Sequence, residues 1–132
     1  MIDDQAPRPL EHGPPSLLLS LLPDLAAFEA TANWEAFRDG IEISRLYGDG
    51  RDGPSAALLR YQAGASVPSH CHGGYEHVFV LAGSQQDDNG DHRAGTLVIN
   101  PPGSRHAVTS EDGCTVLVIW EKPIAFEAPQ GG

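Results

Sequence analysis

From Trp34 onward, apolar and polar residues alternate with a period of two or form short apolar runs. This pattern is typical of β-strands, in which successive side chains point to opposite faces of a sheet. Clusters of Gly, Pro, Asn and Asp separate the runs and predict turns. Strands are expected over 41–47, 56–62, 66–71, 75–82, 96–99, 105–109 and 115–120. Short strands at this regular spacing favour a β-sandwich or a small barrel.

The first third of the chain lacks this alternation. Residues 1–15 are rich in proline and predict an irregular arm. Residues 17–32 have apolar side chains at a helix-like spacing that Pro23 interrupts, so that Pro23 and Asp24 can begin a second helical piece. A helix that covers one edge of the domain is favoured over a dimer contact for this segment. The expected organisation is an arm with a short helical segment over 1–33, a barrel over 34–126 and a tail over 127–132.

The composition excludes several classes of function. The 132 residues suffice for one domain with one modest core. Eighteen acidic and eight basic residues give a formal charge of −10, which disfavours nucleic acid and anionic membrane surfaces as partners. Two cysteines are too few for a disulfide framework. The Leu-rich run over 16–25 is short, follows acidic residues and is not expected to be a signal peptide, so the protein is expected to be cytoplasmic.

Several metal-binding residue types lie within the segment SHCHGGYEHV. Strand alternation places His70 and His72 on one face and Cys71 on the other, and it places Glu76 and His77 on opposite faces of the next run. If the face of His70 and His72 and the face of Glu76 both point inward, two imidazoles and one carboxylate converge. Such a set suits Zn, Fe(II), Mn, Ni or Cu. The alternative is a polar patch on a solvated sheet.

A third imidazole can enter the same cavity. His106 follows the turn NPPG and opens another predicted strand. The neighbouring positions on these strands are apolar, and an unpaired buried histidine or glutamate would cost about 2 kcal/mol or more. Coordination to a metal removes this cost, so a metal site is favoured over a polar patch.

Two segments with fixed spacings resemble the two motifs of the cupin superfamily, the RmlC-like jelly rolls. The first is G-x5-HxH-x3-E-x6-G over 64–83, and the second is G-x5-PxG-x2-H over 95–106, with Ser110 where that motif usually has asparagine. The resemblance implies an all-β jelly-roll barrel of six to eight strands, preceded by the short helical or irregular arm. It also implies one metal ion inside the barrel, held by His70, His72, Glu76 and His106.

A narrower resemblance is to the cupin half of ChrR-type anti-sigma factors and their stand-alone relatives. It rests on the segments WEAFRDGIEISRLY, HCHGGYEHVFVLAG and GSQQDDNGDHRAGTLVINPPGSRHAVTSEDGC. In those two-domain proteins a separate zinc-binding helical domain holds the sigma factor. No His/Cys cluster precedes Trp34 in this sequence, where His12 stands alone, so sigma-factor binding is not expected. The resemblance implies a metal-binding cupin domain.

Two functions are compatible with such a site. In the first, a mononuclear His3Glu site with Zn, Fe, Mn or Ni binds a small molecule, as suits a sensor. In the second, the protein is a metal-dependent dioxygenase or isomerase that acts on a small diketone, enediol or organic acid, with Glu76 as a fourth ligand or as a base. The sequence leaves open whether the protein is an enzyme. Exposed apolar strand edges and the Leu-rich segment predict a homodimer.

Other residues have weaker claims to a function. Cys71 is expected to be a small residue of the sheet, with a redox-sensing thiol as the alternative, and Cys114 is expected to be structural. His12 and His92 are expected to be exposed to solvent, and Arg105 is expected to point outward. Weak candidates for the cavity or its rim are Arg60, Tyr61, Tyr75, Phe79 and Trp120.

Overall fold

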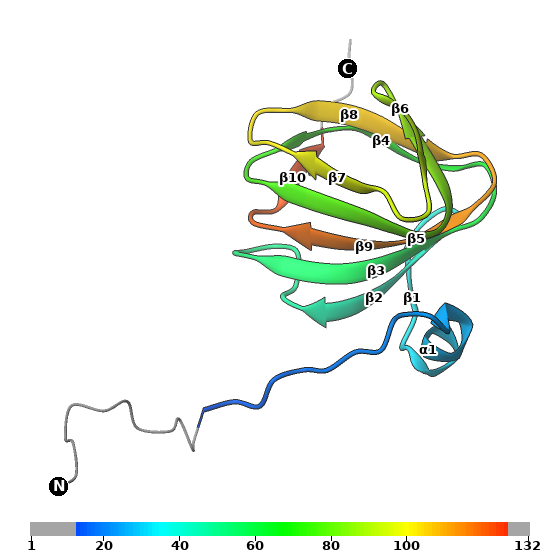
Figure 1. The fold of residues 1–132 in the computed structure, drawn as a ribbon. Coiled ribbons are helices and arrows are strands. Elements are labelled where there is room, and N and C mark those ends of the chain that lie inside the picture. Colours follow the sequence, from blue (N-terminus) through cyan, green and yellow to red (C-terminus); the bar gives the residue numbers. More distant parts are fainter. Residues whose placement is uncertain (1–12, 127–132) are drawn as a thin grey trace, which may run out of the picture. The chain divides into compact units, whose positions relative to one another are not determined.

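The computed structural model describes residues 13–126 as a curled β-sheet preceded by a short helix (Figure 1). The elements are α1 (Leu25–Thr31), β1 (Glu35–Arg38), β2 (Ile41–Tyr47), β3 (Ser55–Tyr61), β4 (Ala65–His72), β5 (Glu76–Asp87), β6 (Gly90–Arg93), β7 (Leu97–Asn100), β8 (Arg105–Ser110), β9 (Cys114–Trp120) and β10 (Ile124–Phe126). The strand order is β1-β2-β3-β9-β5-β8-β4-β10, and β6 and β7 pair with β5. This architecture confirms the predicted all-β, cupin-type fold.

Strand β5 belongs to both sides of the barrel. One side is formed with β1, β2, β3, β9 and β7, and the other with β10, β4, β8 and β6. The first part of β5 pairs with β7 and β9, and its second part, after Gly83, pairs with β6 and β8. Gly83 has a φ of 75°, and a Cβ at this position would lie 2.9 Å from the Cα of Cys114. Glycine is therefore required where the strand passes from one side to the other.

The core lies between these two sides. Inward-facing side chains of β2, β3 and β9 are almost fully buried, and Ile43, Leu59, Val116 and Val118 are each at most 4% exposed. Burial of an aliphatic side chain of this kind contributes about 1.5–3 kcal/mol to folding. The period-two alternation of β2 therefore marks the inward face of the barrel, whereas β3 is buried on both faces along most of its length.

The predicted strands are all present, but the structure contains three more in its described range. Strands β1, β6 and β10 have only three or four residues each, too few for alternation to be recognised. Strand β5 also continues to Asp87, five residues beyond the predicted end at Ala82. The prediction ended too early because the second part of this strand is polar and shows no apolar pattern. The count of six to eight strands that the resemblance implied is therefore too low.

Residue contacts divide the chain into two units on either side of the bond between Ala30 and Thr31. In the first unit, α1 follows Asp24, whose carboxylate accepts a hydrogen bond from the backbone N–H of Ala27 at 3.1 Å. This is an N-cap, and it confirms the helical piece predicted after Pro23.

The earlier part of the same segment was predicted wrongly. Residues 17–22 form no helix. Proline disfavours the helical conformation at the residue before it, and the five residues 17–21 are too few for a stable helix. Within residues 13–126, no helix is long and apolar enough to cross a membrane. The predictions for residues 1–12, including His12, and for the tail at 127–132 lie outside the described residues, and the predicted domain boundaries stay a prediction.

Candidate metal centre

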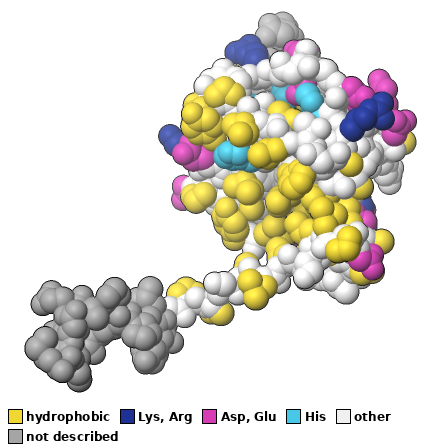
Figure 2. Space-filling model, in the orientation of Figure 1, with side chains coloured by type: hydrophobic (Ala, Val, Ile, Leu, Met, Phe, Trp, Pro, Cys, Tyr) yellow, Lys and Arg dark blue, Asp and Glu magenta, His cyan; other side chains and the backbone are white. Residues whose placement is uncertain are grey.

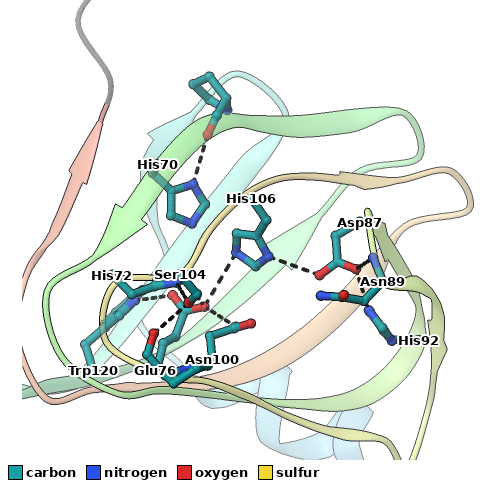
Figure 3. Close-up of polar contacts among 12 residues, drawn as sticks. His70, His72, Glu76, Asp87, Asn89, His92, Asn100, Ser104, His106 and Trp120 are labelled. Carbon is teal, nitrogen blue, oxygen red and sulfur yellow. Dashed lines mark hydrogen bonds and ion pairs between the residues drawn. The ribbon is translucent and has the colours of Figure 1, made fainter.

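Four buried polar side chains converge between the two sides of the barrel (Figure 3). His70 and His72 lie on β4, His106 lies on β8, and Glu76 begins β5. One ligand atom from each side chain lies within 4.8 Å of the others, and each residue is at most 5% exposed. The structure thus brings together the four residues singled out in the sequence.

Strand pairing explains why the imidazoles meet. His70 and His106 are direct partners in the pairing of β4 with β8, and their ring centroids are 4.7 Å apart. His72 follows on the same face of β4, with its ring centroid 5.1 Å from that of His70. Val67 and His70 are three positions apart, so regular alternation would place their side chains on opposite faces. A register shift between them allows both side chains to face inward.

The two histidines of β4 direct their Nδ1 atoms away from the centre. Nδ1 of His70 donates to the carbonyl oxygen of Pro68 at 2.9 Å, and burial lowers the pKa of His70, which favours its neutral form. Nδ1 of His72 donates to the hydroxyl of Ser104 at 2.8 Å, because that hydroxyl gives its own hydrogen to the carbonyl of Pro101 at 2.6 Å. Both imidazoles therefore present the lone pair of Nε2 to the centre.

The third imidazole is oriented by a buried carboxylate. Oδ2 of Asp87 accepts from Nδ1 of His106 at 3.0 Å, while Oδ1 accepts from Nε2 of His92 and from the N–H of Asn89, both at 2.8 Å. Burial alone would raise the pKa of Asp87, but these hydrogen bonds hold the pKa below its usual value. The charged carboxylate thus fixes His106 with Nε2 toward the centre, as carboxylates commonly do behind metal-binding histidines.

Glu76 is held by two donors from neighbouring strands. Oε1 accepts from the side-chain amide of Asn100 at 2.9 Å, and Oε2 accepts from the indole N–H of Trp120 at 2.6 Å. These two hydrogen bonds favour the carboxylate over the protonated carboxyl. The fourth candidate ligand is therefore an anion in a fixed position.

A divalent cation fits the donors at this centre. The Nε2 atoms of His72 and His106 are buried and form no hydrogen bond, although they lie 3.2 and 3.8 Å from Oε1 of Glu76. Their lone pairs face a carboxylate oxygen, which is also an acceptor. A buried group left unpaired costs about 1–3 kcal/mol, and a cation among the four atoms would satisfy the nitrogens and the carboxylate together.

The residues that the sequence excluded from the centre lie elsewhere. His77 stacks on Tyr75, with ring centroids 6.4 Å apart, and Cys71 lies opposite the exposed Arg105 in the pairing of β4 with β8. Cys114 is buried, and burial raises its thiol pKa to about 11, which agrees with the expected structural role. Both thiols are free.

The prediction for His92 was wrong. Its side chain is only 13% exposed because it pairs with Asp87, whereas the surrounding turn residues suggested a solvated loop. Among the weak candidates, Tyr61 and Trp120 line the cavity at the centre, and Arg60 instead forms a salt bridge with Glu42 on β2.

Three residues that orient the candidate ligands were missed in the sequence. Asp87 contacts His106 from the polar end of β5, Ser104 contacts His72 from the turn before β8, and Asn100 contacts Glu76 from the end of β7. None stands at a spacing that predicts its partner. Asn100 directly precedes the PPG turn of the second motif, which is the one local signal that it lies near the centre.

The curled sheet and the buried His3Glu set inside it define a cupin. A family model described as the ChrR Cupin-like domain matches residues 23–122, and the chain therefore belongs to the ChrR cupin-like family. A search of curated proteins found no match.

Solved structures share this fold. A cupin-like protein of unknown function from Ralstonia eutropha is 21% identical with a TM-score of 0.62, and the match covers 70% of this chain but 61% of that one, so the chain spans less than two thirds of its length. The acetylacetone dioxygenase of Acinetobacter johnsonii is 20% identical with a TM-score of 0.68, over 76% of this chain and 75% of that one. The structure of Rhodobacter sphaeroides SigE with the anti-sigma ChrR contains a chain that is 23% identical with a TM-score of 0.61, over 83% and 71% respectively.

Proposed function

We propose that the protein binds one divalent transition metal ion (Zn, Fe, Mn or Ni) through His70, His72, Glu76 and His106, and that a small molecule binds beside the metal. The observation that carries the proposal is the pair of buried, unpartnered Nε2 atoms next to the Glu76 carboxylate. When bound, the metal would supply a Lewis acid with coordination positions open to a small molecule. The free thiols support a reducing, cytoplasmic compartment.

Metal analysis of the purified protein tests this proposal. After dialysis against Zn²⁺ or, without oxygen, Fe²⁺, and removal of free metal, about one equivalent per chain is expected, since the centre offers one set of four ligands. Protein that keeps its fold and takes up no metal under these conditions would contradict the proposal.

A metal-dependent dioxygenase or isomerase is the second candidate function. The likeness to an acetylacetone dioxygenase supports a small diketone as one substrate to test, beside enediols and organic acids. The hydrogen bonds from Asn100 and Trp120 to both oxygens of Glu76 favour a fixed ligand over a mobile base. Oxygen uptake by Fe²⁺-loaded protein with acetylacetone would favour the enzyme, and metal retention without uptake across such a panel would favour the binding function.

We also propose that the protein is a homodimer through the outer face of β7, β5 and β9. Strand pairing aligns Ile99, His77 and Ile119 in one row across this face, beside a second row that contains Leu97. Ile99 and Leu97 are each more than half exposed, and Figure 2 shows hydrophobic side chains gathered on the visible face of the barrel. An exposed apolar patch next to an edge strand favours association with a second copy.

Sedimentation velocity checks the dimer. The wild-type protein is expected to sediment as a dimer, and Ile99→Glu is expected to sediment as a monomer because it places a charge in the buried interface. Ser66→Glu, at an exposed position of β4, is the matched control and should remain dimeric. A monomeric wild-type protein at micromolar concentration would refute the dimer.

A further inference from the structure

A second cavity shares part of its wall with the cavity at the candidate metal centre. This outer cavity has a volume of about 250 Å³, whereas the inner cavity at the metal centre has about 30 Å³, room for about one water molecule. Phe37, Trp120 and Ile124 line both cavities. A molecule in the outer cavity would therefore lie against the same side chains that enclose the metal centre.

Two arginines, Arg45 and Arg51, line the outer cavity, although the chain has a net charge of −10. Arg45 and Arg51 form no salt bridge within the described residues. The guanidinium of Arg45 packs on the backbone of Gly50, where a Cβ would lie 3.2 Å from Nη1. Asp49 also lines the cavity, and the N–H of Arg51 lowers the pKa of its carboxyl. Two cations and one anion leave a single positive charge, which matches a monoanionic ligand.

Ser55 is one of the residues that line the same cavity, and its buried hydroxyl has no hydrogen-bond partner. The residue is 1% exposed. It lies directly opposite Trp120 in the pairing of β3 with β9, next to the boundary between the two cavities. A ligand oxygen that accepts this hydroxyl hydrogen would remove an unpaired buried group, whose cost is about 1–3 kcal/mol.

We propose that the outer cavity binds the carboxylate of a small organic acid through Arg45, Arg51 and Ser55, with the apolar body of the acid directed past Trp120 and Ile124 toward the metal centre. This assignment rests on the proposed function, because the metal gives the bound acid its chemical partner. Guanidinium groups bind carboxylates through paired hydrogen bonds, and the apolar wall suits a hydrocarbon chain or ring. A phosphate dianion would exceed the single net positive charge.

Isothermal titration of the Zn²⁺-loaded protein with matched acids and amides tests the proposal. Benzoate and phenylacetate are the probes, benzamide and phenylacetamide are their neutral counterparts, and inorganic phosphate is the second anion. The acids are expected to bind at least about tenfold more tightly than the amides or phosphate, since charge-assisted hydrogen bonds are the stronger ones. Equal binding of acid and amide, or no binding of either acid at millimolar concentration, would overturn the proposal.

Variants of the cavity locate the binding. Arg45→Gln combined with Arg51→Gln is expected to weaken benzoate binding by about tenfold or more, and Ser55→Ala by about threefold to tenfold. Arg93→Gln is the control, because Arg93 is exposed and pairs with Asp91 outside the cavity. Unchanged affinity in the double variant would overturn the assignment.

Metal content separates this proposal from the proposed function. The cavity variants are expected to keep about one equivalent of metal, because none of the three residues is a candidate ligand. If the wild-type protein retains metal but no acid binds through the arginines, the carboxylate site fails alone. If benzoate binding depends on Arg45 and Arg51 while the wild-type protein takes up no metal, the proposed function fails and the carboxylate site stands.

Discussion

A His72→Ala variant is expected to bind Zn²⁺ at least about 100-fold more weakly than the wild-type protein. The substitution removes one of four buried ligand atoms, and even the loss of a residue that only orients a metal ligand costs 10- to 100-fold in affinity. The remaining donors, His70, His106 and Glu76, would face the metal with one side of its coordination sphere open. Competition with a chromogenic chelator measures the dissociation constant directly.

The thermal transition provides a second readout for this variant. At a metal concentration 100 times the dissociation constant, binding stabilises the wild-type fold by about 2.7 kcal/mol, and His72→Ala should lose nearly all of this gain. Ser66→Ala is the control, because Ser66 is exposed on β4 and lies outside both the centre and the proposed dimer face. Equal metal affinity of His72→Ala and the control would contradict the ligand assignment.

An Asp87→Asn variant is expected to bind metal about tenfold more weakly while keeping its fold. The amide oxygen can still accept the Nδ1 hydrogen of His106, so the expected loss lies at the lower end of the 10- to 100-fold range for such orienting residues. What disappears is the negative charge behind the His106 ring, together with one of the two acceptor oxygens, to which the N–H of Asn89 donates. The visible spectrum of the Co²⁺-loaded protein should change as well, because the substitution alters the surroundings of the candidate ligand His106.

The neighbouring Asp88→Asn is the control for charge alone. Asp88 is exposed in the turn after β5, and its replacement should leave both affinity and spectrum unchanged. If Asp87→Asn lowers the stability of the metal-free protein but leaves metal affinity and the Co²⁺ spectrum as in the wild type, Asp87 serves the turn and not the metal centre.

The clustering of the four candidate ligands could be predicted because it depends on local geometry. Strand alternation separates His70 and His72 from Cys71, and Glu76 from His77, and each of these assignments needs only the pattern of one strand. The spacing around His106 then added a third strand to the same cavity. The barrel itself follows from the same alternation, since residues such as Val116 and Val118 mark the buried face.

The residues that orient the ligands depend on tertiary contacts and were therefore not predictable in the same way. Asp87 meets His106 because β5 crosses Gly83 and continues on the other side of the barrel, where its polar sequence carried no strand signal. The exposure of His92 was predicted wrongly for the same reason, because its side chain is buried by its hydrogen bond to Asp87, which the sequence near His92 does not indicate. The helix prediction for residues 17–22 was wrong for another reason. The apolar residues there have helical spacing, but Pro23 directly after the segment prevents a helix.

The sizes and linings of the two cavities determine which molecules can reach the candidate metal centre. The inner cavity at the metal has about 30 Å³, so a bound molecule larger than water must extend into the outer cavity or displace its boundary. The charged and unpartnered groups of the outer cavity then select which molecules approach. An acid anchored at Arg45 would present its far end to the metal, and the nature of that end decides between binding and turnover.

Anomalous scattering from crystals of the Zn²⁺-loaded protein is the measurement that tests the metal centre most directly. The expected result is one peak in the barrel, within about 2.0–2.2 Å of the Nε2 atoms of His70, His72 and His106 and of a carboxylate oxygen of Glu76. A barrel without a peak, or a metal bound only at other residues, would contradict the account.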